Sequence, residues 1–288
     1  MRDDWVLLVL VTCGPAVVAM AVLWRKISIR AAREKWPFDE LSVRPAGEST
    51  RKEAAAWYEK FFERTVLTLW IPTAIFIVLG NQPRTHGAAF LTAILGVSTL
   101  VALWTSRSLW QALEKWRSYN LGFEGERFVG AELDLLAAKG FEVCHDVPFG
   151  KWNIDHVVVG PTGVWAVETK TRRMPAADGR KTEWTVLVHT DALEFPWGRE
   201  GFGLEQAARN AKSLGEWLTK ATGAPVEVKP VLALPGWMVD RKARNPVMVI
   251  SARNAAGIFS KGLRVLEEDQ IRRIAFQLRE KSRVDIRS

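Results

Sequence analysis

The stretch NIDHVVVGPTGVWAVETK, residues 153–170, decides the fold of the second half of the chain. It contains two apolar runs rich in β-branched residues, separated by Gly160-Pro161-Thr162-Gly163, where Gly and Pro stand at the positions that a turn requires. The stretch is therefore predicted to form a β-hairpin. It also carries Asp155, Glu168 and Lys170, and three charges in an apolar sheet lose their hydration unless partners compensate them.

The length of the turn decides which of these charges face each other. If the turn is a two-residue loop, Asp155 lies directly opposite Glu168, and Lys170 lies on the same face, opposite Asn153. A three-residue loop with Gly163 in the left-handed conformation would shift the pairing by one residue. A bulge would then be needed to bring the two acids together.

Two opposed carboxylates indicate a cation between them, because like charges directly opposite destabilise a sheet. Mg²⁺ suits such a pair, since it keeps much of its hydration and binds through one or two carboxylates together with substrate phosphate. A lysine ammonium one pleat away can stabilise the charge that builds on phosphate. Two acids and a lysine on one sheet face therefore form an arrangement suited to phosphodiester cleavage.

The alternative for the same residues is an ordinary structural role. Glu168 and Lys170 can form an ion pair at the end of a sheet, which is the usual fate of neighbouring charges. His156 is expected to point to the face opposite Asp155 and to pack there. Asp146 is expected in a turn.

Residues 119–288 have the pattern of an α/β domain with a mixed sheet covered by helices. A helix that stops at Gly140, a good C-cap, opens it. The other predicted strands are 141–149, 183–190, 226–235 and 246–251, and the other predicted helices are 204–222 and 267–281.

The first 118 residues have the composition of a membrane region. Residues 5–24 are uncharged and have the length of a bilayer-spanning helix, residues 65–80 form a shorter apolar run, and residues 86–105 again reach spanning length. A basic loop, residues 25–64, is expected to lie on the inner leaflet, where anionic lipid attracts it. Three transmembrane helices are therefore expected.

The charges that flank the apolar runs predict the orientation of the chain. Loops rich in Lys and Arg stay in the cytoplasm, and only the turn around Arg84 is poor in them. The N-terminus is therefore expected outside the inner membrane and the C-terminal domain in the cytoplasm. A cleaved signal peptide is the alternative for residues 5–24, but here the basic cluster follows the apolar run instead of preceding it.

Composition excludes several other classes of function. The two cysteines, Cys13 and Cys144, fall in different predicted compartments, so no disulfide is expected. The net charge of +8 comes partly from the basic loop and is weak evidence for nucleic acid. The chain lacks a Walker A loop and a kinase signature, which excludes a nucleotide-driven motor in this polypeptide.

A family resemblance joins these motifs. Gly125-Glu126, the run Asn153–His156, the turn Gly160–Gly163 and Glu168-Thr169-Lys170 together resemble the NERD (nuclease-related) domain, a branch of the PD-(D/E)xK restriction-endonuclease-like superfamily. The resemblance covers residues 122–214 and continues more loosely through the two later strands. It implies a restriction-endonuclease-like mixed β-sheet flanked by helices, preceded here by a three-helix transmembrane region.

The resemblance also implies roles for single residues. Asp155 and Glu168 would be the carboxylates that bind Mg²⁺ or Mn²⁺, and Lys170 would be the catalytic lysine. Glu126 of the opening helix would be a further acid at the edge of the metal. For Glu126 the alternative is a favourable charge at the start of a helix, and Glu124 stands close enough to be confused with it.

One part of the family pattern departs in this chain. Gln206 matches the family's glutamine on the helix after the sheet, and Asn210 follows one turn later, where both would help to position water or phosphate. In the family Asn-Pro often precedes this glutamine, whereas Phe202-Gly203 stands here. An ordinary solvated helix is the alternative for Gln206, because Gln is a good helix former.

The sequence thus predicts a membrane-anchored, metal-dependent nuclease, with DNA as the expected substrate and RNA as the alternative. Four basic residues that follow the hairpin would add affinity for a phosphate backbone, or else form a solvated loop: Arg172, Arg173, Arg180 and Lys181. The alternative function is a non-catalytic, membrane-tethered module that binds nucleic acid or a protein through the same fold. A third interpretation makes the spans the working part and the domain a sensor. Many nucleases of this superfamily act as homodimers, and the oligomeric state stays open.

Overall fold

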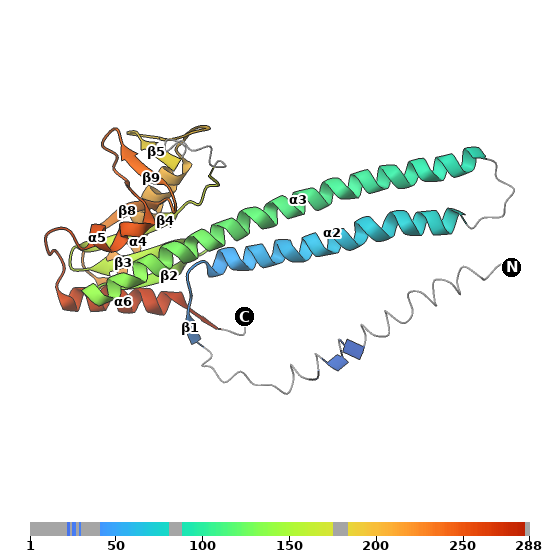
Figure 1. Ribbon diagram of the computed structural model, residues 1–288. Coiled ribbons are helices and arrows are strands. Elements are labelled where there is room, and N and C mark those ends of the chain that lie inside the picture. Colours follow the sequence, from blue (N-terminus) through green and yellow to red (C-terminus); the bar gives the residue numbers. More distant parts are fainter. Residues whose placement is uncertain are drawn as a thin grey trace. The chain divides into compact units, whose positions relative to one another are not determined.

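The computed structural model describes residues 41–80, 88–174 and 184–285, together with residues 22, 23, 25, 26 and 29. The chain divides into two compact units (Figure 1). Unit 1 comprises Met1–Asp39 and Tyr58–Glu114, and unit 2 comprises Glu40–Trp57 and Lys115–Ser288. The segment Glu40–Trp57, which the sequence assigns to the membrane region, therefore belongs to the same unit as the C-terminal domain.

Two long helices run through unit 1. Helix α2 spans Glu48–Gly80 and helix α3 spans Ala88–Asp134. Among the described residues, no helix combines the length and the apolarity that crossing a membrane requires. The three-helix transmembrane region thus has no support in the structure, and nearly all of the predicted first span lies outside the described residues.

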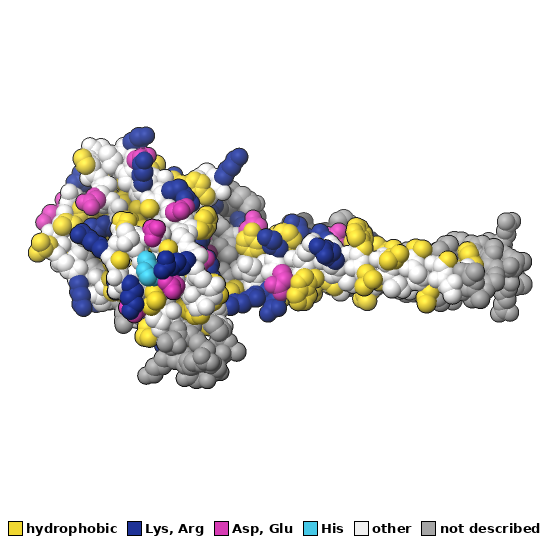
Figure 2. Space-filling view, turned by 90° about the horizontal axis from the view of Figure 1, so that it is seen from above, with side chains coloured by type: hydrophobic (Ala, Val, Ile, Leu, Met, Phe, Trp, Pro, Cys, Tyr) yellow, Lys and Arg dark blue, Asp and Glu magenta, His cyan; other side chains and the backbone are white. Residues whose placement is uncertain are grey.

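Both helices expose large apolar side chains, and Figure 2 shows yellow patches on the elongated part of the molecule. The most exposed in α2 are Leu69 and Phe62, at 65 % and 64 %, and in α3 Trp104 and Leu100, at 72 % and 67 %. Helix α3 also continues into unit 2 without a break. The predicted helix of the C-terminal domain is therefore the end of α3 together with the 3₁₀ turn η1 (Leu135–Lys139), and Gly140 caps it in the left-handed conformation, as expected.

A five-stranded mixed sheet forms the centre of unit 2, which confirms the predicted α/β class. Its strands are β2 (Glu142–Phe149), β3 (Trp152–Gly160), β4 (Gly163–Thr169), β8 (Val228–Ala233) and β10 (Met248–Ile250). Their order is β10-β8-β4-β3-β2. Strands β2, β3 and β4 pair antiparallel, and β8 joins β4 and β10 in parallel.

The register of the β3–β4 hairpin is the one that a two-residue turn predicts. Gly160 pairs with Gly163, and the ladder continues to His156, which pairs with Val167. The next register position in each strand holds Asp155 and Glu168. The hairpin therefore sets these two acids opposite each other, and no bulge is needed.

A hydrophobic core covers each face of the sheet. The end of α3 and helix α5 (Ala255–Phe259) pack on one face, where Leu133 and Phe259 join Trp165. Helices α4 (Phe202–Thr222) and α6 (Glu268–Ser282) cover the other, where Leu214 and Leu278 join Val157. Successive side chains of β3 and β4 point to opposite faces of the sheet, and a layer of helices buries each face. Both strands are therefore apolar on both faces.

The predicted strand 183–190 lies elsewhere than expected. It forms β5 (Thr185–Val188) in a second sheet, with β6 (Leu193–Phe195), β7 (Gly198–Glu200) and β9 (Met238–Arg241) in the order β7-β6-β5-β9. The expectation of one mixed sheet was wrong here, because β5 pairs in parallel with the distant β9. A further pair joins β1 (Leu41–Val43) to β11 (Arg283–Asp285).

Candidate active site

Three buried acids from three different elements meet at one end of the central sheet. Asp155 lies in β3, Glu168 in β4 and Glu126 in α3, and their exposed fractions are 8 %, 1 % and 7 %. Burial raises the pKa of each of the three. The other two acids raise the pKa of Asp155 further, which shows that the carboxylates act on one another.

Glu168 is the acid with the most polar contacts. Lys170 donates from Nζ to Oε1 at 2.7 Å, and Asn210 of α4 donates from Nδ2 to Oε2 at 2.7 Å. Burial raises the pKa of Glu168, and these two donors oppose the rise. Lys170 itself follows β4, and its backbone N–H donates to the carbonyl of Ala233 at 3.0 Å. The ion pair that was the structural alternative is thus present, and it lies among acids that it only partly compensates.

Asp155 receives one hydrogen bond in the described structure. The backbone N–H of Thr169 donates to Oδ2 at 2.7 Å. This bond lowers the pKa of Asp155, and the charge of Lys170 lowers it as well, but burial and the charges of Glu168 and Glu126 outweigh both. Asp155 is therefore an acid whose ionised form lacks compensation within the protein.

Glu126 is the inward-facing member of the Gly-Glu motif. Thr50 at the start of α2 donates from Oγ1 to its Oε1 at 2.7 Å, while Oε2 is buried and no described residue donates to it. Burial raises the pKa of Glu126 to about 7. Glu124, two residues earlier, is 56 % exposed and pairs with Arg127, so the structure separates the two candidates.

Gly125 explains how α3 brings Glu126 to the sheet. A Cβ at this position would lie 1.7 Å from Oγ1 of Thr171, just beyond Lys170. Any side chain would therefore push the helix away from the chain that leaves β4. The Gly-Glu pair works as one unit, in which the glycine permits the approach that the acid needs.

Helix α4 supplies Asn210 and Gln206 from successive turns. Asn210 is 4 % exposed and bonds Glu168, whereas Gln206 is half-buried one turn earlier. Gly203 belongs to the Phe202-Gly203 pair that replaces the family's Asn-Pro. A Cβ at this position would lie 3.3 Å from Lys170 Cγ and from Leu232, so a glycine permits the close packing seen here. The first turn of α4 thus packs directly on the lysine. The structure brings Asn210 to the acids, and it shows no hydrogen bond between Gln206 and a described residue.

Two contributors were missed or misread from the sequence. Thr50 is separated from Glu126 by 76 positions and carries no local signal. Asp146 was expected in a turn, but it is fully buried in β2, where its φ is 48°. Its Oδ2 accepts from Arg44 Nη1 and Ser49 Oγ, each at 2.9 Å, and its Oδ1 accepts from Asn153 Nδ2 at 2.6 Å.

Other candidate residues have structural roles. His156 is fully buried on the other face, where its Nδ1 lies 2.9 Å from Nδ1 of His145, in agreement with the packing role expected for it. Burial holds the pKa of His156 well below its ordinary range. Arg172 pairs with Glu200 through two hydrogen bonds of 2.9 and 3.1 Å. Arg180 and Lys181 lie outside the described residues.

The donor set can be tested against a divalent cation. Among the described residues, no group of three His, Cys, Asp or Glu side chains is arranged to hold a metal ion. Mg²⁺ nevertheless needs only one or two protein carboxylates, because it keeps several waters. Asp155 and Glu168 at opposed positions, with the buried Oε2 of Glu126 lacking a donor, are hard oxygen ligands whose charge a cation would compensate. The residues present therefore fit such an ion.

Comparison with known proteins gives one match. Residues 121–235 match the family described as NERD, nuclease-related domain. Neither the curated proteins nor the solved structures give a match. Glu126, Asp155, Glu168, Lys170 and Gln206 all lie inside the matched range, whereas Thr50 lies outside it. The range that matches the nuclease-related domain, residues 121–235, thus contains all three acids of the buried cluster.

Proposed function

We propose that unit 2 is a metal-dependent nuclease that hydrolyses phosphodiester bonds of nucleic acid, DNA in preference to RNA. One observation carries this proposal above the others. Asp155, Glu168 and Glu126 are buried together with raised pKa values, and beside them lies a lysine whose ammonium contacts only one of the three. Perturbed acids next to a fixed cation are typical of catalytic sites.

Each side chain has a role in this proposal. Asp155 and Glu168 would hold Mg²⁺ or Mn²⁺, with Glu126 at the edge of the ion, and the bound ion would supply Lewis-acid polarisation of the phosphate. Lys170 holds its proton at Nζ and stabilises the negative charge that develops on the phosphate. Asn210 and Lys170 fix the orientation of the Glu168 carboxylate. Gln206, one turn from Asn210, would bind phosphate oxygen or water.

The second candidate function is a non-catalytic module that binds nucleic acid or a protein through the same fold. The ion pair between Lys170 and Glu168 favours it, because both groups already have a partner. So does the lack, among the described residues, of a ready three-ligand metal cluster. The two candidates differ in whether removal of one acid abolishes hydrolysis or leaves the activity of the chain unchanged.

The test is cleavage of supercoiled DNA, linear DNA and RNA by the full chain in Mg²⁺ and in Mn²⁺. Wild type is compared with Glu168→Gln, and Glu216→Gln on the exposed side of α4 is the control. The nuclease proposal expects cleavage by wild type and by the control, and a loss of at least about a thousandfold in Glu168→Gln. Absence of cleavage by all three proteins would favour the binding module, and equal cleavage by all three would remove Glu168 from the mechanism.

Membrane association is a separate part of the proposal. The exposed apolar side chains of α2 and α3 support it, because extended exposed apolar surface marks contact with a membrane or a partner. We propose that unit 1 attaches the chain to the inner membrane and that the nuclease-related domain lies in the cytoplasm. We also propose that two copies of the chain form a homodimer. Fractionation of cells, followed by alkaline extraction of the membranes and crosslinking, tests attachment and pairing. Release of the chain by alkali would contradict insertion.

A further inference from the structure

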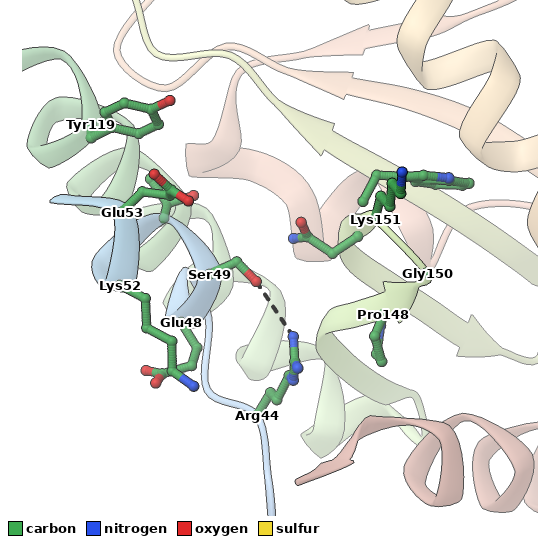
Figure 3. A pocket seen from close by; sticks show the side chains of 12 residues that line it. Arg44, Glu48, Ser49, Lys52, Glu53, Tyr119, Pro148, Gly150 and Lys151 are labelled. Carbon is green, nitrogen blue, oxygen red and sulfur yellow. Dashed lines mark hydrogen bonds between the residues drawn. The ribbon is translucent and has the colours of Figure 1, made fainter. Parts of the chain in front are cut away.

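A cavity of about 510 Å³ lies in unit 2 beside the cluster of acids (Figure 3). It is enclosed by the start of α2 and the preceding loop, by Tyr119 of α3 and by the turn between β2 and β3. The lining includes Ser49, Thr50, Lys52, Tyr119, Lys151 and Trp152. Its volume falls within the range of roughly 300–1,000 Å³ that small-ligand pockets occupy.

The cavity adjoins the acids through Thr50. This side chain lines the cavity, and its hydroxyl bonds Glu126 at 2.7 Å. Ser49, also in the lining, donates to the buried Asp146. The segment Glu40–Trp57 lies outside the matched family range, so this chain builds one wall of the cavity from residues that the nuclease-related domain itself does not contain.

The chemistry of the walls suits one nucleotide. Figure 3 shows Lys52 on the α2 side and Lys151 on the opposite side, and ammonium groups bind the phosphates of a nucleic acid strand without regard to sequence. The lining contains two acids, Glu48 and Glu53. Arg51 binds Glu48 through two hydrogen bonds of 2.8 Å. That ion pair reduces the repulsion that Glu48 would exert on phosphate.

An aromatic surface stands beside these cations. Trp152 stacks on Phe149 with ring centroids 5.0 Å apart and an interplanar angle of 23°, and its side chain is 40 % exposed. Lys281 fixes Phe149 from another side, with Nζ 4.5 Å from the ring centroid. Trp152 is therefore a supported ring with exposed surface, and such rings bind unpaired bases by stacking.

We propose that this cavity binds an unpaired nucleotide next to the phosphodiester that is hydrolysed at the acids, with its base against Trp152 and its phosphate at Lys52 and Lys151. This inference rests on the proposed function and names its substrate class. A paired base inside a duplex cannot enter a cavity of this size without leaving the stack. The preferred substrates are therefore single strands, overhangs and frayed ends.

The test measures binding separately from cleavage. The full chain carrying Glu168→Gln is titrated with fluorescein-labelled oligothymidylate and with a blunt duplex of equal length, in Mg²⁺, and fluorescence anisotropy reports affinity. Into this parent are placed Trp152→Ala and, as a second variant that leaves the aromatic packing intact, Lys151→Glu. Their controls are Trp184→Ala, 42 % exposed in the wild type, and Lys261→Glu, also at an exposed position.

The proposal expects each cavity variant to weaken oligothymidylate binding about tenfold, to change duplex binding less, and to leave the controls at the parent affinity. Cavity variants that bind like the parent, or a parent that does not bind oligothymidylate, would overturn it. Cleavage by wild type and by Trp152→Ala in the wild-type background, measured in parallel, separates the two proposals. If oligothymidylate binding depends on Trp152 but wild type cleaves nothing, the nuclease proposal is refuted and the nucleotide-binding cavity is supported. If wild type cleaves and Trp152→Ala binds and cleaves as well as wild type, the nuclease proposal is supported and the nucleotide-binding cavity is refuted.

Discussion

Asp146 and Asp155 stand at opposite register positions of neighbouring strands, because His145 pairs with His156 and Val147 with Ile154. Both aspartates are buried, at 0 % and 8 % exposure. Three side chains donate to Asp146, whereas a single backbone N–H donates to Asp155, which also faces two further acids. A buried acid that the protein compensates is structural, whereas one left with uncompensated charge takes up a proton or binds a cation.

This difference assigns separate tasks to the two halves of the site. The network around Asp146 ties the segment Glu40–Trp57 to the sheet, since Arg44 and Ser49 both belong to that segment. The acids Asp155, Glu168 and Glu126 lie at the end of the hairpin, where their carboxylate oxygens can bind a cation. Thr50 connects the two groups, because it follows Ser49 directly and bonds Glu126.

After Glu168→Gln, the next largest effect is expected at Lys170. Lys170→Met keeps a side chain of similar length without the charge, and we expect the rate of phosphodiester cleavage to fall by about 10²- to 10³-fold, because one group that stabilises transition-state charge is lost. Cleavage assays of the full chain under single-turnover conditions measure it. Lys212→Met, at an exposed position on α4, should cleave like wild type. A Lys170→Met protein of normal activity would remove the lysine from the mechanism.

Asp146→Asn should act on stability instead. The substitution removes the charge that Arg44 pairs with and sets an amide N–H₂ against donors, so the free energy of unfolding should fall by about 3 kcal/mol. Urea unfolding measures this. Asp240→Asn breaks an exposed ion pair with Lys242 and should cost less than about 1 kcal/mol. Equal losses in both variants would show that Asp146 is not a structural centre.

Glu126 predicts how stability depends on pH in protein freed of divalent metal. Its pKa rises from 4.5 to about 7 in the folded chain, mainly through burial, so between these pH values the folded state binds more protons than the unfolded state. Its contribution is therefore fully present below pH 4.5 and is lost as pH rises through 7. The rise corresponds to about 3 kcal/mol.

Chemical unfolding at pH 5 and at pH 8 measures this contribution, with Glu126→Gln as the comparison. The variant should depend less on pH than wild type by up to the same amount, because Gln does not titrate. An identical pH dependence of the two proteins would show that Glu126 is ionised in the folded state at pH 5.

The smallest effect is expected at Thr50. Thr50→Val removes the hydroxyl that donates to Glu126 and keeps the shape of the side chain. Because this bond lowers the pKa of Glu126, its loss should raise that pKa and cost about 1 kcal/mol of unfolding free energy at pH 8. Thr65→Val, whose hydroxyl bonds only a carbonyl of its own helix, is the control. A larger loss in the control would contradict the contact.

The sequence predicts the hairpin and its acids because their arrangement is local. Two glycines around Pro161-Thr162 define a two-residue turn, and counting along the strands then places Asp155 opposite Glu168. The amphipathic pattern of α4 in the same way predicts a helix, which carries Asn210 into contact with Glu168. Period and turn geometry thus fix the part of the site that the hairpin and this helix build.

The rest depends on contacts that no local pattern encodes. Thr50 and Glu126 are 76 positions apart, and Arg44 and Asp146 are 102 apart. The segment that carries Thr50 and Arg44 is polar and is part of the basic loop 25–64, which the sequence explains equally well by contact with a membrane. Strand β5 pairs in parallel with β9 across more than fifty positions, so its place in a second sheet could not be predicted either.

The most direct test of the account is isothermal titration of Mg²⁺ and Mn²⁺ into the full chain as wild type, Asp155→Asn and Asp146→Asn. We expect wild type to bind a divalent cation, Asp155→Asn to bind it at least about tenfold more weakly, and folded Asp146→Asn to bind it like wild type. Wild-type protein that binds neither ion, or equal binding by wild type and Asp155→Asn, would contradict the claim that these buried acids are kept for a metal.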